Sequence, residues 1–94
     1  MKLTTGTKAV TAAGTAERLV AVASNVSVRS AVVVAKEGNA GLVYVGNSEV
    51  SGSNTPPLNP GDALELGGHD PFNLADVYLD VSVSGEGVDY VAES

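Results

Sequence analysis

The chain has no cysteine, no tryptophan and only one histidine in its 94 residues. Without cysteine, neither a disulfide framework nor a thiolate metal site can form, and the sequence does not indicate an oxidising or a reducing compartment. A single histidine also excludes a histidine-rich metal site. His69 stands beside Asp70 in a segment with glycine and proline, where adjacent residues rarely hold a catalytic pair. We therefore expect no metal, no cofactor and no enzymatic activity.

Basic residues are missing from the second half of the chain. Residues 1–50 carry a net charge of +2, whereas residues 51–94 contain eight acidic residues and no basic one, a net charge of −8. One interpretation is that the two halves interleave in the fold, so that the asymmetry averages out. The other is a head-to-tail contact between copies, basic flank against acidic flank. In that contact the candidate partner-binding residues are Lys2, Lys8, Arg18 and Arg29.

Long apolar runs and aromatic clusters are also missing. No run approaches the roughly 18 residues of a membrane span, and residues 1–10 lack the apolar core of a signal peptide. We expect a soluble protein without a classical export signal or membrane partner. Nucleic-acid binding is not expected, because no basic cluster is interleaved with aromatic residues. Four aromatic residues and no disulfide leave a small core, which favours a homo-oligomer.

What the chain does contain is valine in short runs separated by turn residues, which is typical of β-strands. We expect an all-β fold, a single antiparallel β-sandwich with jelly-roll-like connections. Residues 1–16 are predicted to form an extended N-terminal arm with a short edge strand at 8–11, or a frayed terminus. Residues 17–94 form the sandwich domain. The predicted strands are 17–24, 26–36, 42–45, 62–66, 76–84 and 88–92.

Two of these strands carry the clearest patterns. In residues 26–36 the even positions, such as Val28 and Val32, are predicted to face the core, and the odd positions to lie under a loop or partner. In residues 76–84, Val77, Leu79, Val81 and Val83 are predicted to be buried, whereas Asp76, Tyr78 and Asp80 face water. The two aspartates would lie about 13 Å apart, too far for a retaining glycosidase pair. Two hairpins are expected, 26–36 with 42–45 and 76–84 with 88–92.

Between strands 42–45 and 62–66 runs a polar segment of Ser, Gly, Asn, Thr and Pro that is expected at the surface. It ends at Pro60-Gly61, a pair that suits a type II turn, because proline fixes φ and glycine accepts φ > 0. Farther along, residues 67–71 are expected to be irregular. Phe72 and Leu74 are expected to close one end of the core.

Residues 41–51, GLVYVGNSEVS, and 56–66, PPLNPGDALEL, are followed by NLADVYLDV at 73–81 and GEGVDYVA at 85–92. In this order, these blocks resemble small virion proteins of tailed bacteriophages. The resemblance implies a compact β domain that assembles on the phage particle, most simply as a head decoration protein bound to the major capsid protein. It also implies a virion location, with assembly in the host cytoplasm.

Two alternatives stay open. The first is a tail or neck accessory protein that binds another virion protein. The second is a module that binds a host-surface glycan through the amides of Asn47, Asn54 and Asn59, although this segment lacks the aromatic platform of most glycan sites. For self-association, we expect a closed ring if the charge contact is head-to-tail and closes, with a trimer as the first choice among closed rings.

Overall fold

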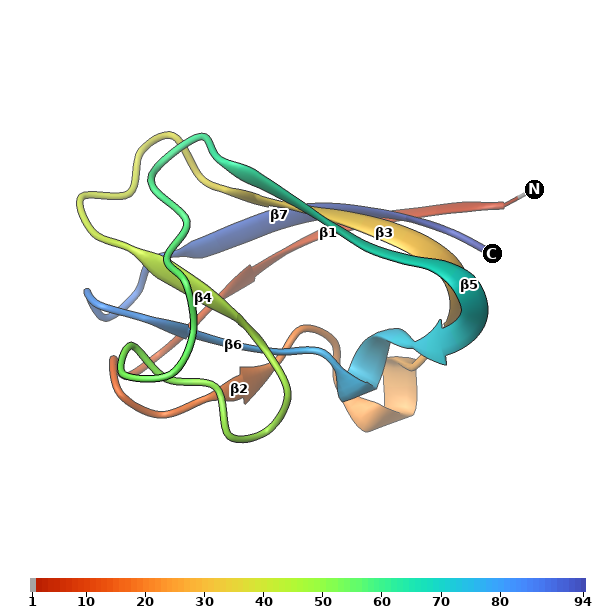
Figure 1. Ribbon diagram of the computed structural model, residues 1–94, viewed down its shortest axis with the longest axis horizontal. Helices are drawn as coiled ribbons and strands as arrows, with labels where there is room; N and C mark the ends of the chain where they lie inside the picture. Colours follow the sequence, from red (N-terminus) through yellow and green to blue (C-terminus); the bar gives the residue numbers. More distant parts are fainter. Residues whose placement is uncertain (1) are drawn as a thin grey trace.

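Two antiparallel sheets pack face to face in the computed structural model, which describes residues 2–94 apart from the side chains of residues 68 and 69 (Figure 1). One sheet has the strand order β1-β7-β3-β5 and the other β2-β6-β4. The strands are β1 (Leu3–Ala9), β2 (Glu17–Arg18), β3 (Ser27–Ala35), β4 (Val43–Gly46), β5 (Ala63–Asn73), β6 (Tyr78–Val81) and β7 (Gly87–Glu93). The all-β prediction is confirmed. The expectation for His69 lies outside the described side chains.

The core lies between the two sheets and is built mainly from valine and leucine. Leu74 and Leu79 are fully buried in it, as are Val33, Val43 and Val88. Because these side chains belong to both sheets, each sheet covers the apolar face of the other. In the described residues, no helix is long and apolar enough to cross a membrane.

The face of β3 that points into the core was predicted only in part. Val28 is buried as expected, but farther along the strand the buried residues are Ala31, Val33 and Ala35, on the opposite parity. The pairing of β3 with β5 shifts register between Val28 and Ser30. Between these two pairs, residues 68–71 of β5 stand against Arg29 alone, so the regular alternation along β3 is interrupted at this point. The small odd-numbered residues are therefore core, and the even-numbered valines point outward.

Neither predicted hairpin forms. β3 pairs with β5 and β7, whereas β4 pairs with β6 in the other sheet. The chain likewise leaves β6 for the opposite sheet and enters β7. Turn residues predict that the chain reverses, but they do not determine which sheet the next strand joins. Both segments cross between the layers, at the left-hand end of the molecule in Figure 1.

Seven residues of the predicted N-terminal arm, Leu3–Ala9, form strand β1 of the four-stranded sheet. β1 pairs antiparallel with β7 from Leu3 opposite Glu93 to Ala9 opposite Gly87. The backbone oxygen of Lys2 also accepts a hydrogen bond of 2.9 Å from the N–H of Ser94. Strand β1 is an edge strand whose partner lies at the far end of the sequence, so no local pattern could indicate the pairing.

Strand β5 is longer than predicted and includes the segment expected to be irregular. It continues from Ala63 to Asn73, and Gly67 adopts a φ of 88° within it. The predicted type II turn before it is confirmed, because Gly61 has a φ of 87° and the Asp62 N–H donates to the Asn59 oxygen over 2.9 Å. At the other end, Phe72 packs against the core, as expected.

Two predicted strands are shortened by 3₁₀ turns. Residues 17–24 contain only β2 before the turn η1 (Val22–Ser24), and residues 76–84 begin with the turn η2 (Leu74–Asp76) before β6. Asp80, expected in water, is only 2% exposed, and Val83, expected in the core, is 42% exposed. Alternation fails here because β6 ends at Val81 and because Asp80 has backbone donors to satisfy it.

The strand order bears on the first interpretation of the charge asymmetry, in which the two halves interleave. In both sheets, strands from the first half of the chain alternate with strands from the second half. Basic and acidic segments are therefore neighbours throughout the fold, and Lys36 pairs with Asp89 over 3.0 Å. The interleaving agrees with the first interpretation, and the head-to-tail contact between copies stays a prediction.

Candidate interaction surface

Among the described residues, no other layer covers the side of the four-stranded sheet that points away from the core, as Figure 1 shows. We call this side the outer face. The ladder registers place Leu3, Thr5 and Thr7 of β1 beside Glu93, Val91 and Asp89 of β7, and these in turn beside Ser30, Val32 and Val34 of β3. Ala63 and Glu65 of β5 complete the face opposite Val34 and Val32.

The middle of the outer face is apolar. Val91 is 45% exposed, and its neighbour Val32 lies directly opposite it on β3. Val34 lies one position along the same face, and both β3 valines are half-buried by their neighbours. Leu3, 58% exposed, stands at the end of β1. A patch of β-branched side chains in the centre of an uncovered sheet face is the kind of surface that another protein covers.

Charged side chains surround this patch. The Lys36 ammonium donates a hydrogen bond of 3.0 Å to Asp89, and this contact holds the pKa of Asp89 below its usual range. Glu65 and Glu93 stand on the strands to either side. Such a rim favours a partner with basic groups around an apolar centre.

The predicted basic residues do not form one site. Lys8 makes an ion pair of 2.9 Å with Glu17. This contact, together with the Thr11 N–H that donates to the same carboxylate over 2.7 Å, holds the pKa of Glu17 below its usual range. Lys2 and Arg29 are exposed. Lys8 thus serves to join β1 to β2.

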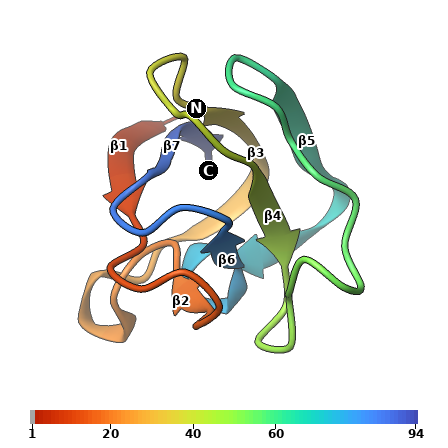
Figure 2. The ribbon, with the colours of Figure 1, turned by 90° about the vertical axis from the view of Figure 1, so that its left-hand side faces the viewer.

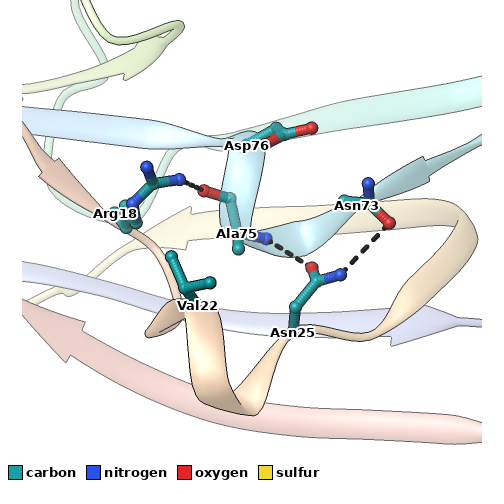
Figure 3. Close-up of a pocket in the computed structure, with 6 residues that line it drawn as sticks. All are labelled: Arg18, Val22, Asn25, Asn73, Ala75 and Asp76. Carbon is teal, nitrogen blue, oxygen red and sulfur yellow. Dashed lines mark hydrogen bonds between the residues drawn. The ribbon is translucent and has the colours of Figure 1, made fainter.

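Arg18 lines a surface pocket of about 300 Å³ (Figure 3). Its guanidinium donates a hydrogen bond of 2.7 Å to the Ala75 oxygen and lies 4.9 Å from the centre of the Tyr78 ring. Across the pocket, Asn25 donates to the Asn73 side chain over 3.2 Å and accepts from the Ala75 N–H over 2.9 Å. These contacts tie the two 3₁₀ turns together, so the pocket's polar groups are largely used within the fold.

The polar segment that carries the candidate glycan-binding amides forms hydrogen bonds within itself. The Asn54 side chain accepts from the Ser51 N–H over 3.0 Å and donates to the Glu49 oxygen over 2.9 Å. The Asn47 side chain accepts from the Glu49 N–H over 2.9 Å. Asn59 is exposed next to the type II turn. Two of the three amides therefore organise the loop, which weakens the glycan interpretation.

Sequence reasoning missed the acceptors that hold the connections between the sheets. Residues 11–14 donate backbone N–H groups to Glu17, Ser84 and Asp80, with distances of 2.7 to 2.9 Å. Residues 41 and 42 donate to Glu86 and Ser82 over 2.9 and 2.8 Å. Part of the acidic excess in the second half is thus structural, because carboxylates satisfy backbone donors that have no strand partner. No local motif marks these contacts.

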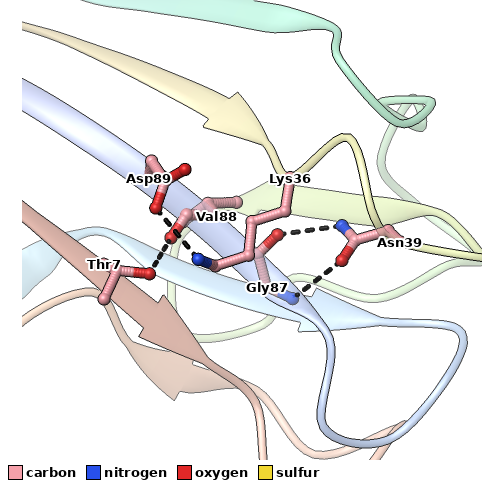
Figure 4. A network of polar contacts seen from close by, with 6 residues as sticks. All are labelled: Thr7, Lys36, Asn39, Gly87, Val88 and Asp89. Carbon is pink, nitrogen blue, oxygen red and sulfur yellow. Dashed lines mark hydrogen bonds and ion pairs between the residues drawn. The ribbon is translucent and has the colours of Figure 1, made fainter.

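The buried Asn39 connects another such crossing to β7 (Figure 4). Its amide donates to the Gly87 oxygen over 2.9 Å and accepts from the Gly87 N–H over 3.4 Å.

Within the described residues, no group of three or more His, Cys, Asp or Glu side chains is placed to hold a metal ion. No family model, curated protein or solved structure matches this chain.

Proposed function

We propose that this protein is a non-enzymatic structural component of a tailed-phage particle and that it decorates and reinforces the head. The observation that carries the proposal is the uncovered apolar centre of the outer face, formed by Val32, Val34 and Val91. Its surface suits contact with another protein. The assignment to a phage particle rests on the resemblance of residues 41–92 to small virion proteins.

The partner in this proposal is the major capsid protein or a neighbouring virion protein, and the protein itself is a homo-oligomer. A sheet face with an apolar centre and a polar rim matches the anatomy of protein–protein interfaces. A tail or neck position remains the alternative within this class. Jelly-roll-like connectivity also remains a proposal, and the connections that cross between the sheets after β3 and β6 support it.

Purified particles of the phage that encodes the chain test the proposal. We expect quantitative mass spectrometry to find the protein in the particle at many copies. Recovery only as free protein, or at a few copies per particle, would contradict the decoration role. Few copies located at the tail or neck would favour the alternative.

A variant pair tests the outer face itself. Val91→Lys places a charge in the centre of the patch, whereas Val83→Lys changes a similarly exposed valine that lies outside the sheets. Lysine is chosen because Val91 stands between Asp89 and Glu93, where a new acidic residue would add repulsion. We expect Val91→Lys to lose incorporation into particles and Val83→Lys to keep it. Equal incorporation of both variants would refute the outer face as the attachment surface.

A further inference from the structure

Strand β1 leaves one side of its backbone free. The Val10 N–H donates to Glu86 and the Lys2 oxygen accepts from Ser94, so even-numbered residues direct their backbone groups toward β7. Successive residues of a strand direct these groups to opposite sides. Leu3, Thr5, Thr7 and Ala9 therefore direct theirs toward the open edge. In the part of the chain that the structure describes, no strand pairs with this edge, as Figure 2 shows at its left.

The other sheet edges are short or interrupted. β5 contains Pro71 and has a glycine with positive φ at Gly67, opposite the register shift in β3. β2 has two residues and β4 has four, and Val43 of β4 also bridges to Leu58. Short strands, bulges and prolines are devices by which proteins protect sheet edges. β1 has seven residues, and its one lysine, Lys8, is ion-paired with Glu17 of the same chain.

We propose that β1 is a self-pairing edge, at which two copies of this chain join antiparallel about a two-fold axis at Gly6. The occupant is a second copy because the strand is complementary to itself in this register. Leu3 faces Ala9 of the second copy, and Thr5 faces Thr7 of the second copy. Threonine pairs are favourable cross-strand neighbours. Lys8 faces Thr4 of the second copy, so no like charges oppose one another.

The register is set by overlap and by parity. Centring on Gly6 pairs all seven residues of β1, and the four edge-facing residues form about eight backbone hydrogen bonds, two per facing pair. A shift of two residues loses part of this overlap, and a shift of one residue turns the side chains to opposite faces. The result is one continuous eight-stranded sheet, two four-stranded sheets joined at β1, whose outer faces adjoin.

Gly6 at the two-fold axis also lets the two copies of β1 approach each other. The Tyr90 ring lies against Gly6, where an added Cβ would come 2.5 Å from the tyrosine hydroxyl. The tyrosine thereby covers the inner side of β1, and the strand at the axis presents no side chain of its own. Two strands facing glycine to glycine can approach closely at that point.

A charge pair at positions 5 and 7 tests the proposal. Thr5→Lys with Thr7→Lys sets lysine opposite lysine twice across the axis, whereas Thr5→Glu with Thr7→Lys sets opposite charges there and keeps the same lysine beside Asp89. Both double variants change the same exposed positions, so a loss of fold alone would affect both. In sedimentation velocity we expect a dimer for the unchanged chain, a dissociation constant raised at least about tenfold for the first variant, and a retained dimer for the second.

Cross-linking fixes the register, because the chain has no cysteine of its own. We expect chains carrying Thr5→Cys, mixed with chains carrying Thr7→Cys, to form disulfide-linked dimers on mild oxidation. Each variant alone should form far fewer, because positions 5 and 5, or 7 and 7, do not face one another in this register. Efficient linking of either variant alone would refute it.

The oligomeric state of the unchanged protein can overturn the proposal directly. A monomer at millimolar concentration, a trimer, or a dimer unaffected by the two lysines would each refute β1 self-pairing. These measurements use purified protein without phage particles. Absence of a β1 dimer in solution would therefore leave the proposed decoration role standing. Conversely, loss of particle incorporation in the Val91→Lys variant would leave the proposed β1 dimer standing.

Discussion

Gly87 is the position where a single added carbon should damage the fold most. The atoms around it on the β1 side belong to the backbone: a Cβ would lie 1.9 Å from the Lys8 oxygen and 2.7 Å from the Ala9 Cα. Neither atom belongs to a flexible side chain. To reach a tolerated distance, β1 and β7 would have to separate by roughly 1 Å at this point, in an interior that is close-packed.

The cost of Gly87→Ala follows from this separation. Forcing a carbon into a packed interior costs about 1–3 kcal/mol, and a collision with backbone belongs at the upper end of that range. The two hydrogen bonds between Asn39 and Gly87 would also lengthen, and each contributes about 0.5–1.5 kcal/mol. We expect a loss of about 3 kcal/mol, which for a domain of this size lowers the Tm by about 12–24 °C.

Thermal and urea unfolding followed by circular dichroism measure this loss. The matched control is Gly38→Ala, because a Cβ at Gly38 meets nothing within 4 Å and its φ is not positive. The control should be neutral or stabilising by up to about 1 kcal/mol, since alanine restricts the unfolded chain. A Gly87→Ala variant with the same Tm as the control would refute the close approach of β1 to β7.

Three further predictions concern buried and paired groups. Asp80→Ala removes the acceptor of the Val81 N–H and should lower the free energy of unfolding, measured by urea titration, by about 1–3 kcal/mol. The control, Asp76→Ala at an exposed position, should change this free energy by less than about 0.5 kcal/mol. Equal effects of the two substitutions would contradict the burial of Asp80. Val81→Asp buries an unpaired charge and should cost at least about 3 kcal/mol, so a folded variant with an unchanged urea midpoint would contradict its place in the core. The lowered pKa values of Glu17 and Asp89 contribute stability that is present above about pH 4.3 and is lost as the pH falls through the folded-state values; urea midpoints that do not fall between pH 6 and pH 3 would contradict this.

The structure also explains why so acidic a chain needs few basic partners. Glu17, Asp80 and Glu86 accept hydrogen bonds from backbone N–H groups where the chain crosses between the sheets. These crossings have no strand neighbour to satisfy their donors, and a carboxylate is a strong acceptor there. Acidity near the end of the chain is thus partly a means of fastening loops from its beginning.

The sequence by itself determined the class of secondary structure and some local geometry. Short valine runs predict strands because a branched Cβ restricts χ1 and packs well on a pleated sheet. Pro60-Gly61 predicts its turn because each residue fixes or permits one backbone angle. Leu79 and Val81 alternate into the core as expected. These features depend on a residue and its near neighbours, so one stretch of sequence contains the information.

The tertiary structure decided which face of a strand is buried, which sheet each strand joins and which strand it pairs with. The buried positions of β3 change parity where its pairing with β5 is interrupted, between Val28 and Ser30, and β5 lies more than thirty residues away in the chain. Asp80 is buried because the distant Gly14 N–H meets its carboxylate. The first strand pairs with the last because Gly87 lets the two backbones approach. Each outcome depends on contacts between segments far apart in the chain, which no local pattern encodes.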